Sequence, residues 1–347
     1  MENKTTQPSP AAILQVCTGF WASKILMTAS KFSLFTHLAK KPNQSAKEIK
    51  IVLDLKCTDR NAYDFLDALT ALGFLKRNGL LDTAKYSNTL DTDVFLDQAK
   101  PSYIGGLLEM QNTQGWEVWA KLGKGLKTGL NQHQVKAGDN SVFDLFYTDP
   151  EQFKNFVEGM TGVQMGNFMA LAHKFDFSIY KTMVDVGGSA GVLSALVAKD
   201  NPHIQCITFD LPKLEPIANQ TIQKFQLEKQ VTAMNGDFFK DELPKSDIVT
   251  MGNILHDWDE DTKIKLMQTA YDALPNGGAF IAIENIIDNE RKQNIFGLML
   301  SLNMLIETGD GFDYTFDDFN RWAKKAGFSD TELLPLAGPG SAAIAYK

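Results

Sequence analysis

The pattern of apolar and polar residues changes near residue 180 of the chain. Before this point, apolar residues recur at the spacing of helices, with little sign of strands. After it, short runs rich in valine and isoleucine alternate with helical stretches, which is typical of βα units on a parallel sheet. The pattern predicts a mainly helical first part and an α/β second part.

Residues 11–40 predict one long helix whose apolar residues occupy more than one stripe. A helix of this kind is expected to be buried on several sides, which is more cover than one small domain provides. The segment therefore indicates a contact with a partner subunit.

Two further helices and a hairpin complete the outline of a winged helix. Residues 45–55 open with the capping box Ser45 and Glu48, and residues 58–75 begin at a second cap. Asn78-Gly79 is a strong signal for a hairpin. A winged helix can bind DNA through its third helix.

Charge argues against DNA as the partner of this outline. Its third helix carries Asp59, Asp64 and Asp67 against Arg60, and the whole chain has a formal charge of −8. Phosphates repel such a surface. We therefore expect a packing or dimerisation module and no nucleic-acid partner.

Composition is that of an ordinary globular protein, with 44% hydrophobic and 22% charged residues among 347. No charge-free apolar run reaches the length of about 18 residues that spans a bilayer, and no secretory signal opens the chain. Cys17, Cys57 and Cys206 show no CxxC spacing, so neither disulfides nor a cysteine metal site are predicted. These features indicate a cytoplasmic protein without membrane contact.

The segment after the winged-helix outline is rich in large, soft side chains. They include Trp116, Trp119, Phe143, Phe146, Phe153, Phe156, Met160, Met165 and Phe168. Such residues form ordinary core or the wall of an apolar small-molecule pocket, and composition leaves both interpretations open.

A glycine-rich turn follows the first buried strand, residues 183–186. Gly187, Gly188 and Gly191 form this turn before a helix at 192–199, so a ligand can approach the backbone closely. The spacing is not the G-x-G-x-x-G of dinucleotide folds, and no Gly-Lys-Ser/Thr follows it. Neither a dinucleotide nor a nucleotide phosphate is therefore favoured.

Three aspartates fall at or near the ends of successive strands. Asp185 precedes the glycine turn, Asp210 ends the second strand, and Asp237 with Phe238 follows the third. Each aspartate alone fits a cap or turn, and Asp210 alone fits NAD equally well. Because carboxyl ends of parallel strands share one sheet edge, the set favours a cationic nucleoside with an amino-acid tail, such as S-adenosylmethionine.

His256 lies at a βα junction beside this edge, after a strand at 247–253, and Glu284 lies in the next strand. The other four histidines, His37, His133, His173 and His203, are interpreted as structural. A phenol (pKa about 10) is about 3.5 units less acidic than a histidinium, a deficit of roughly 5 kcal/mol. A carboxylate such as Glu284 raises histidine basicity, and no metal cluster is visible in the sequence.

The motifs VDVGGSAG, FDLP, GDFF and NILHDW, in this order, resemble those of the plant-type and hydroxyindole-like small-molecule O-methyltransferases. The resemblance covers nearly the whole chain. It implies a class I methyltransferase with a Rossmann-like, seven-stranded α/β sheet. It also implies a winged-helix dimerisation domain (1–100), a helical connector at the acceptor pocket (101–175) and a methyltransferase domain (176–347). A homodimer that methylates a small aromatic hydroxyl with S-adenosylmethionine is expected, without metal.

The resemblance also implies roles for individual residues. Those expected to bind S-adenosylmethionine are Asp185, Gly187, Gly188, Gly191, Asp210, Leu211, Gly236, Asp237, Phe238 and Phe239. His256 would be the general base with Glu284 beside it. Phe156, Met160, Asn303 and Met304 would line the acceptor pocket.

Two positions depart from the family pattern. The family often has G-x-E-R-T, whose glutamate also flanks the base, whereas this chain reads GDGFDYT at 309–315 with Asp313 as the nearest match. Some branches have a lysine where this chain has Gly252. The acceptor stays unnamed, and N-methylation or a ligand-responsive winged-helix regulator remain as alternatives.

Overall fold

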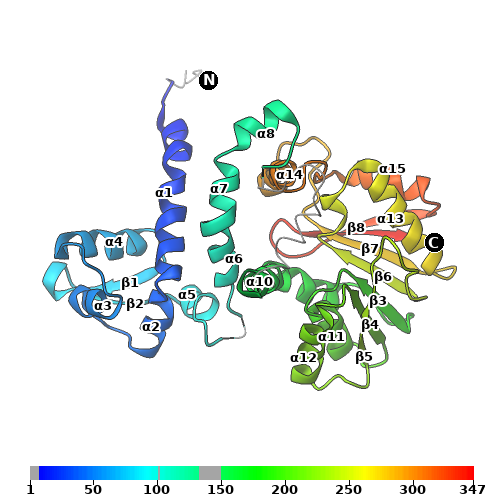
Figure 1. Ribbon diagram of the computed structural model, residues 1–347, viewed down its shortest axis with the longest axis horizontal. Coiled ribbons are helices and arrows are strands. Elements are labelled where there is room, and N and C mark those ends of the chain that lie inside the picture. The colour runs from blue at the N-terminus through cyan, green and yellow to red at the C-terminus, as the bar shows by residue number, and fades with distance from the viewer. Residues whose placement is uncertain (1–7, 101, 133–149) are drawn as a thin grey trace, which may run out of the picture. The chain divides into compact units, whose positions relative to one another are not determined.

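The computed structural model describes residues 8–100, 102–132 and 150–347, and the chain divides into two compact units, Met1–Trp116 and Glu117–Lys347 (Figure 1). The predicted residues His133, Phe143 and Phe146 lie outside the described residues. The division at residues 100 and 175 stays a prediction.

The first unit is mainly helical. Its elements are α1 (Ala11–Lys31), α2 (Leu34–Lys40), α3 (Ala46–Val52), α4 (Asp59–Ala71), β1 (Leu75–Asn78), η1 (Leu81–Thr83), β2 (Lys85–Asn88), α5 (Leu90–Phe95), α6 (Gly105–Met110) and the π-helical turn η2 (Gln111–Gly115). The single helix predicted over 11–40 is wrong, because Ser33 adopts a left-handed φ of 55° and separates α1 from α2.

The winged-helix outline is confirmed in its local details. Ser45 and Glu48 form the capping box of α3, and Thr58 caps α4 through the Asn61 amide. Strands β1 and β2 pair antiparallel from Leu75–Asn88 to Asn78–Lys85. Leu34, Phe35, Leu38, Ile49, Leu66, Leu69 and Tyr86 belong to the core beneath them.

Most of helix α1 is exposed in the single chain, which fits the expectation that one small domain does not cover it. Ala29 and Ser30 are its buried residues, whereas Val16 is 82% exposed. Ile13, Leu14, Phe20 and Trp21 are exposed as well. By length and composition alone α1 could also cross a membrane, although Lys24 interrupts its apolar run. Core helices of soluble proteins meet the same criteria.

The second unit contains a seven-stranded sheet in the order β5-β4-β3-β6-β7-β9-β8. The strands are β3 (Thr182–Val186), β4 (Gln205–Asp210), β5 (Val231–Asn235), β6 (Ile248–Gly252), β7 (Ala279–Glu284), β8 (Asp330–Pro335) and β9 (Ser341–Tyr346). β3 to β7 are parallel, while β8 and β9 form the predicted antiparallel hairpin. The predicted α/β fold with a helical N-terminal part is confirmed.

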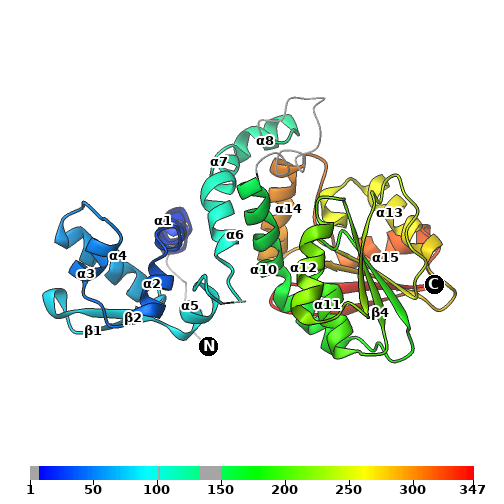
Figure 2. The same cartoon turned by 60° about the horizontal axis from the view of Figure 1, so that its bottom comes forward.

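Helices cover both faces of this sheet (Figure 2). The helices from residue 116 onward are α7 (Trp116–Trp119), α8 (Leu122–Thr128), α10 (Pro150–Lys174), α11 (Val192–Asp200), α12 (Glu215–Phe225), η3 (Leu255–Asp257), α13 (Glu260–Ala273), α14 (Ile295–Glu307) and α15 (Phe316–Lys325). α10, α11 and α12 pack on one face and α13 and α15 on the other. Successive side chains of a strand point to opposite faces of the sheet, so Met183 and Val184 belong to different core clusters.

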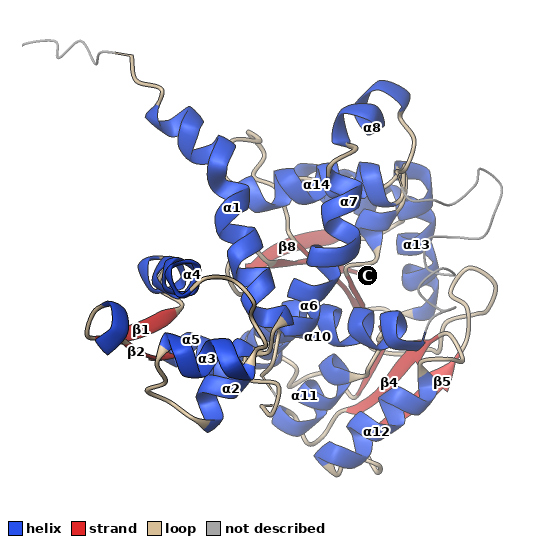
Figure 3. Cartoon of the chain, turned by 60° about the vertical axis from the view of Figure 1, so that its left-hand side comes forward, coloured by secondary structure: helices blue, strands red, loops and turns tan. Residues whose placement is uncertain are grey.

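The strand order reverses between β3 and β6. Open α/β sheets bind ligands outside the carboxyl ends of their strands at such a reversal. The glycine turn, Asp210, His256 and Glu284 all lie at or just past these carboxyl ends. Helices α8 and α14 lie side by side in the same unit (Figure 3).

Candidate active site

The turn after β3 is built for close backbone contact. Gly187 and Gly191 adopt left-handed φ values of 70° and 69°. A Cβ on Gly188 would lie 2.2 Å from Thr208 Oγ1 and 3.0 Å from the Asp185 carbonyl oxygen. The turn therefore requires glycine for its own conformation and packing.

Asp210 fastens this turn to the end of β4. Its carboxylate accepts hydrogen bonds from the Ser189 amide (2.8 Å) and the Leu211 amide (2.7 Å). Burial raises the pKa of Asp210 to about 6, against the effect of these two donors. Sequence reasoning placed Asp210 at the site but did not foresee that it holds the turn.

Asp185 is a second buried carboxyl group beneath the same turn. It accepts a hydrogen bond from Thr250 Oγ1 at 2.7 Å. Burial, with a smaller contribution from the nearby Asp210 carboxylate, raises its pKa to about 7 against the effect of the Thr250 hydrogen bond. Because a cation would stabilise both carboxylates, this pair fits a cationic ligand such as S-adenosylmethionine and disfavours a phosphate.

The residues after β5 make most of their polar contacts with the backbone and side chains of their own turn. Gly236 donates its amide to the Asp210 carbonyl at 2.9 Å. The Asp237 carboxylate accepts from the Phe239 amide (2.9 Å) and pairs with Lys240 (2.7 Å). Phe238 packs against the core, and the half-exposed Phe239 ring stands edge-on to Trp258 with centroids 4.7 Å apart.

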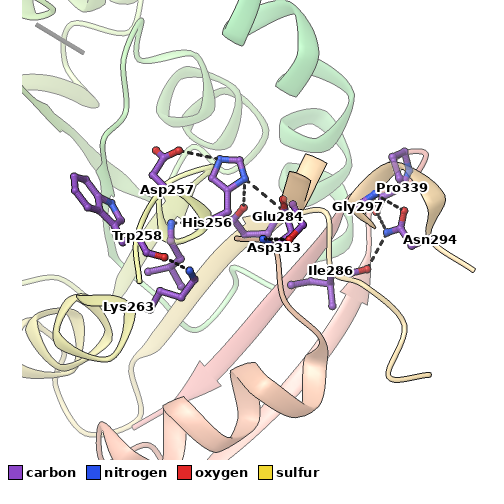
Figure 4. A network of polar contacts seen from close by, with 12 residues as sticks. His256, Asp257, Trp258, Lys263, Glu284, Ile286, Asn294, Gly297, Asp313 and Pro339 are labelled. Carbon is purple, nitrogen blue, oxygen red and sulfur yellow. Dashed lines mark hydrogen bonds and ion pairs between the residues drawn. The ribbon is translucent and has the colours of Figure 1, made fainter. Parts of the chain in front are cut away.

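His256 lies in the short helix η3 that follows β6, among three carboxylates (Figure 4). Its Nδ1 is 3.5 Å from Glu284 Oε2 and 3.4 Å from Asp313 Oδ1, and its Nε2 is 3.6 Å from Asp257 Oδ1. Glu284 Oε1 also accepts the Leu255 amide at 3.1 Å. The end of β7 therefore holds the η3 turn that carries the histidine.

These neighbours make His256 a strong base. Burial alone would lower the pKa of His256, but the carboxylates of Glu284, Asp257 and Asp313 outweigh it and raise the pKa to about 10. Burial raises the pKa of Glu284 to about 7 and that of Asp257 to about 6, although the histidine opposes both shifts. The group exchanges protons as one coupled unit.

Asp313 reaches the histidine despite its short side chain. A Cβ on Gly311 would lie 2.6 Å from the His256 carbonyl oxygen and 2.7 Å from that of Asp257. Glycine therefore lets the loop after α14 approach the η3 turn closely, which compensates for the missing methylene of a glutamate.

Two charged residues beside His256 escaped the sequence reasoning. Asp257 directly follows His256 in η3, and its carboxylate lies 3.6 Å from the imidazole Nε2. Lys263 on α13 is fully buried, and the sequence carries no signal for this because lysine is rarely buried.

The structure places the proposed acceptor residues on two helices of the second unit. Phe156 of α10 packs with Ala190 and Val192 beside the glycine turn, and Met160 lies one turn further along α10. On α14, Met304 is buried and the Asn303 side-chain oxygen accepts the Trp119 indole N–H at 2.7 Å.

Ligand atoms of His256, Glu284 and Asp313 lie within 4.8 Å of one another, a spacing that a metal ion could use. The sequence predicted no metal site. His256 Nδ1 stands 3.4 Å from Asp313 Oδ1 and 3.5 Å from Glu284 Oε2, which is longer than an ordinary N–H···O hydrogen bond, and these three buried atoms have no hydrogen-bond partner among the described residues.

Known proteins match both units. An O-methyltransferase dimerisation domain matches residues 14–98, and an O-methyltransferase domain matches residues 119–329. The tetracenomycin polyketide synthesis 8-O-methyl transferase TcmO of Streptomyces glaucescens is 36% identical over 97% of both chains. The N,N-dimethyltransferase OxyT of Streptomyces rimosus is 30% identical over 93% of both chains.

Solved structures agree with this assignment. Human N-acetylserotonin methyltransferase in complex with SAM superposes with a TM-score of 0.89 at 25% identity and covers 100% of this chain and 99% of its own. PigF with SAH gives 0.86 at 26% identity, with 98% and 100% covered. The chain therefore belongs to the family of S-adenosylmethionine-dependent O-methyltransferases.

Proposed function

We propose that the chain methylates a hydroxyl group of a small aromatic metabolite of the phenolic, indolic or polyketide type, with His256 as the general base. The observation that carries the proposal is a buried histidine among carboxylates at the sheet edge that holds the glycine turn. S-adenosylmethionine supplies an electrophilic methyl group on a sulfonium. The glycine turn, Asp185, Asp210 and Leu211 would hold it, with Gly236, Asp237, Phe238 and Phe239 at its adenine end.

Residues of the chain can remove the proton that the acceptor hydroxyl loses on methylation. Nδ1 of His256 faces Glu284 and Asp313, so Nε2 accepts the proton of the acceptor hydroxyl. Proton transfer from a phenol of pKa about 10 to a base of matching pKa is close to balanced. Glu284 and Asp313 stabilise the imidazolium that forms and fix the orientation of its ring.

This arrangement predicts a pH profile in which kcat/KM rises with pH until His256 loses its proton, near its pKa of about 10. Glu284→Gln keeps the oxygen that accepts the Leu255 amide but removes a negative charge, so the midpoint should move to lower pH. The profile is measured with two acceptors whose hydroxyl pKa values differ, so that a midpoint common to both belongs to the enzyme and not to the acceptor. An unmoved midpoint in Glu284→Gln would contradict the role of this carboxylate.

Acceptor chemistry is tested with matched compounds. A panel of fused-ring phenols and the corresponding aryl amines should show faster turnover of the phenols, because a positioned base helps most where a proton must leave oxygen. The 30% identity to an N,N-dimethyltransferase makes amine acceptors the second candidate. Faster turnover of the amines would establish that second function instead.

Metal removal is expected to leave the reaction unchanged. After dialysis against EDTA, kcat should equal that of the untreated enzyme, because proton transfer at His256 requires no cation. Loss of activity that a divalent ion restores would reassign His256, Glu284 and Asp313 to metal chemistry.

We propose a homodimer formed through the first unit, supported by the dimerisation-domain match and the exposed apolar residues of α1. Light scattering should give about twice the chain mass of 38.5 kDa. Val16→Asp should shift the equilibrium toward monomer because it puts a charge into an apolar contact. Leu80→Asp, at another exposed apolar site, in the loop between β1 and β2, is the control. A monomeric wild-type chain would refute the proposal.

We also place the enzyme in the cytoplasm. All three cysteines are free thiols, two of them exposed, which suits a reducing compartment.

A further inference from the structure

Lys263 is a buried cation in the second turn of α13, next to the proposed base. It is fully buried, and among the described residues no other lysine or arginine is in the buried class. Lysine is almost never fully buried unless it is paired. Its surroundings therefore have to explain why it is there.

Its contacts join two segments that are distant in sequence. The Nζ donates a hydrogen bond to the Trp258 carbonyl oxygen and stands 3.5 Å from the centroid of the Phe312 ring. The rings of Tyr314 and Trp322 lie 5.9 Å away. An ammonium group over an aromatic face is stabilised by the ring quadrupole, most strongly where water is excluded.

Each of these segments carries a member of the base cluster. Trp258 ends the η3 turn that contains His256, and Phe312 and Tyr314 flank Asp313 on both sides. Successive side chains of an extended segment point in opposite directions, which matches Phe312 beside Lys263 and Asp313 beside His256. Figure 4 shows Lys263 and Trp258 next to the cluster.

Charge points to the same cluster. Burial lowers the pKa of Lys263 to about 8, although Glu284, Asp313, Asp257 and Asp259 act in the opposite direction. The lysine is thus charged at neutral pH.

The groups that act on one another here come from several elements. They are His256 and Asp257 on η3, Asp259 and Lys263 around the start of α13, Glu284 on β7, Glu307 on α14 and Asp313 after it. The Lys263 cation lowers the pKa of Asp257 and so favours the ionised form of that carboxyl group.

We propose that Lys263 is a positioning residue that ties the η3 turn to the 312–314 segment and favours the ionised form of Asp257 beside His256. The kinetic part rests on the proposed function. In this role Lys263 contacts neither S-adenosylmethionine nor the acceptor, and it acts through His256 and Asp313.

The test compares Lys263→Met with Lys265→Met. Both substitutions remove one positive charge from α13, but Lys265 is exposed. Methionine fills most of the lysine volume and removes its charge. Normalised to the number of S-adenosylmethionine sites found by calorimetry, kcat should fall about tenfold or more in Lys263→Met, since misplaced groups cost that much, and stay unchanged in Lys265→Met.

A second readout needs no turnover. The ring resonances of His256, assigned with a His256→Gln variant, sense the ionisation of Glu284 and Asp257 near neutral pH. This step should move up by about one pH unit in Lys263→Met, because the lost cation no longer favours the ionised form of Asp257. If the wild type methylates no phenol, the proposed function fails while this readout still decides on Lys263.

Phe312→Leu separates contact from charge and serves if Lys263→Met does not fold. It keeps the lysine but removes the ring. We therefore expect kcat to fall, while the carboxyl ionisation sensed by the His256 resonances stays at the pH of the wild type. The proposal is overturned if Lys263→Met has the kcat of the wild type and the carboxyl ionisation sensed by His256 stays at the same pH. A wild-type kcat in Phe312→Leu would overturn the part of the proposal in which Lys263 ties the two segments together.

Discussion

Replacing His256 by alanine should lower kcat by on the order of 10²-fold or more, while S-adenosylmethionine binds as tightly as to the wild type. Positioned acid–base catalysis typically supplies a factor of this size. The pKa of about 10 makes His256 a base matched to a phenol, and no such group remains in the variant. Initial rates with a saturating acceptor, together with calorimetric binding, provide the measurement.

His173→Ala is the matched control for this experiment. His173 is exposed, pairs with Asp200 at 3.4 Å and lies at the end of α10, so its loss should leave kcat unchanged. A His256→Ala enzyme that keeps its rate on a good acceptor would remove the general base from the mechanism. A loss of rate that comes with lost S-adenosylmethionine binding would assign His256 to the cofactor instead.

Gly188→Ala should weaken binding of S-adenosylmethionine by about tenfold or more, as expected when a methyl group is forced into a packed site at a cost of about 1–3 kcal/mol. The added Cβ would meet Thr208 Oγ1 at 2.2 Å and Asp185 Oδ2 at 2.9 Å. Relief of this overlap displaces the turn or the two side chains beneath it. Titration calorimetry with S-adenosylmethionine and S-adenosylhomocysteine measures the effect.

The control is Gly123→Ala in α8, where an added Cβ meets nothing within 4 Å. Thermal unfolding of both variants shows whether the fold is kept. Wild-type affinity in a folded Gly188→Ala protein would mean that the glycine turn does not hold the ligand.

Much of the α/β half could be predicted because its signals are local. The strand before Gly187, the strand that ends at Asp210 and the hairpin near the C-terminus each carry their own pattern of valine, isoleucine and glycine, and the structure confirms them. The single helix over 11–40 failed because Ser33 adopts a left-handed conformation that few residue patterns announce. The incomplete cover of α1 was foreseen, because its apolar residues occupy more than one stripe, and Ile13, Val16 and Phe20 are exposed in the single chain.

In the candidate site, too, residues with a local sequence signal were predicted and residues without one were missed. His256 and Glu284 were found because strand order brings the ends of β6 and β7 together. Asp257 and Lys263 were missed, because their burial depends on the loop after α14, whose path the sequence does not reveal. Asp237 stays ambiguous, because its pairing with Lys240 suits the turn as well as a ligand.

The most direct test of the central claim follows the methyl group itself. The purified enzyme is incubated with S-adenosylmethionine carrying a labelled methyl group and with an aromatic acceptor that offers both a hydroxyl and an amine. The account predicts an aryl methyl ether, labelled at the oxygen, in equimolar amount with S-adenosylhomocysteine. Label on nitrogen or carbon, or S-adenosylhomocysteine without a methylated acceptor, would contradict it.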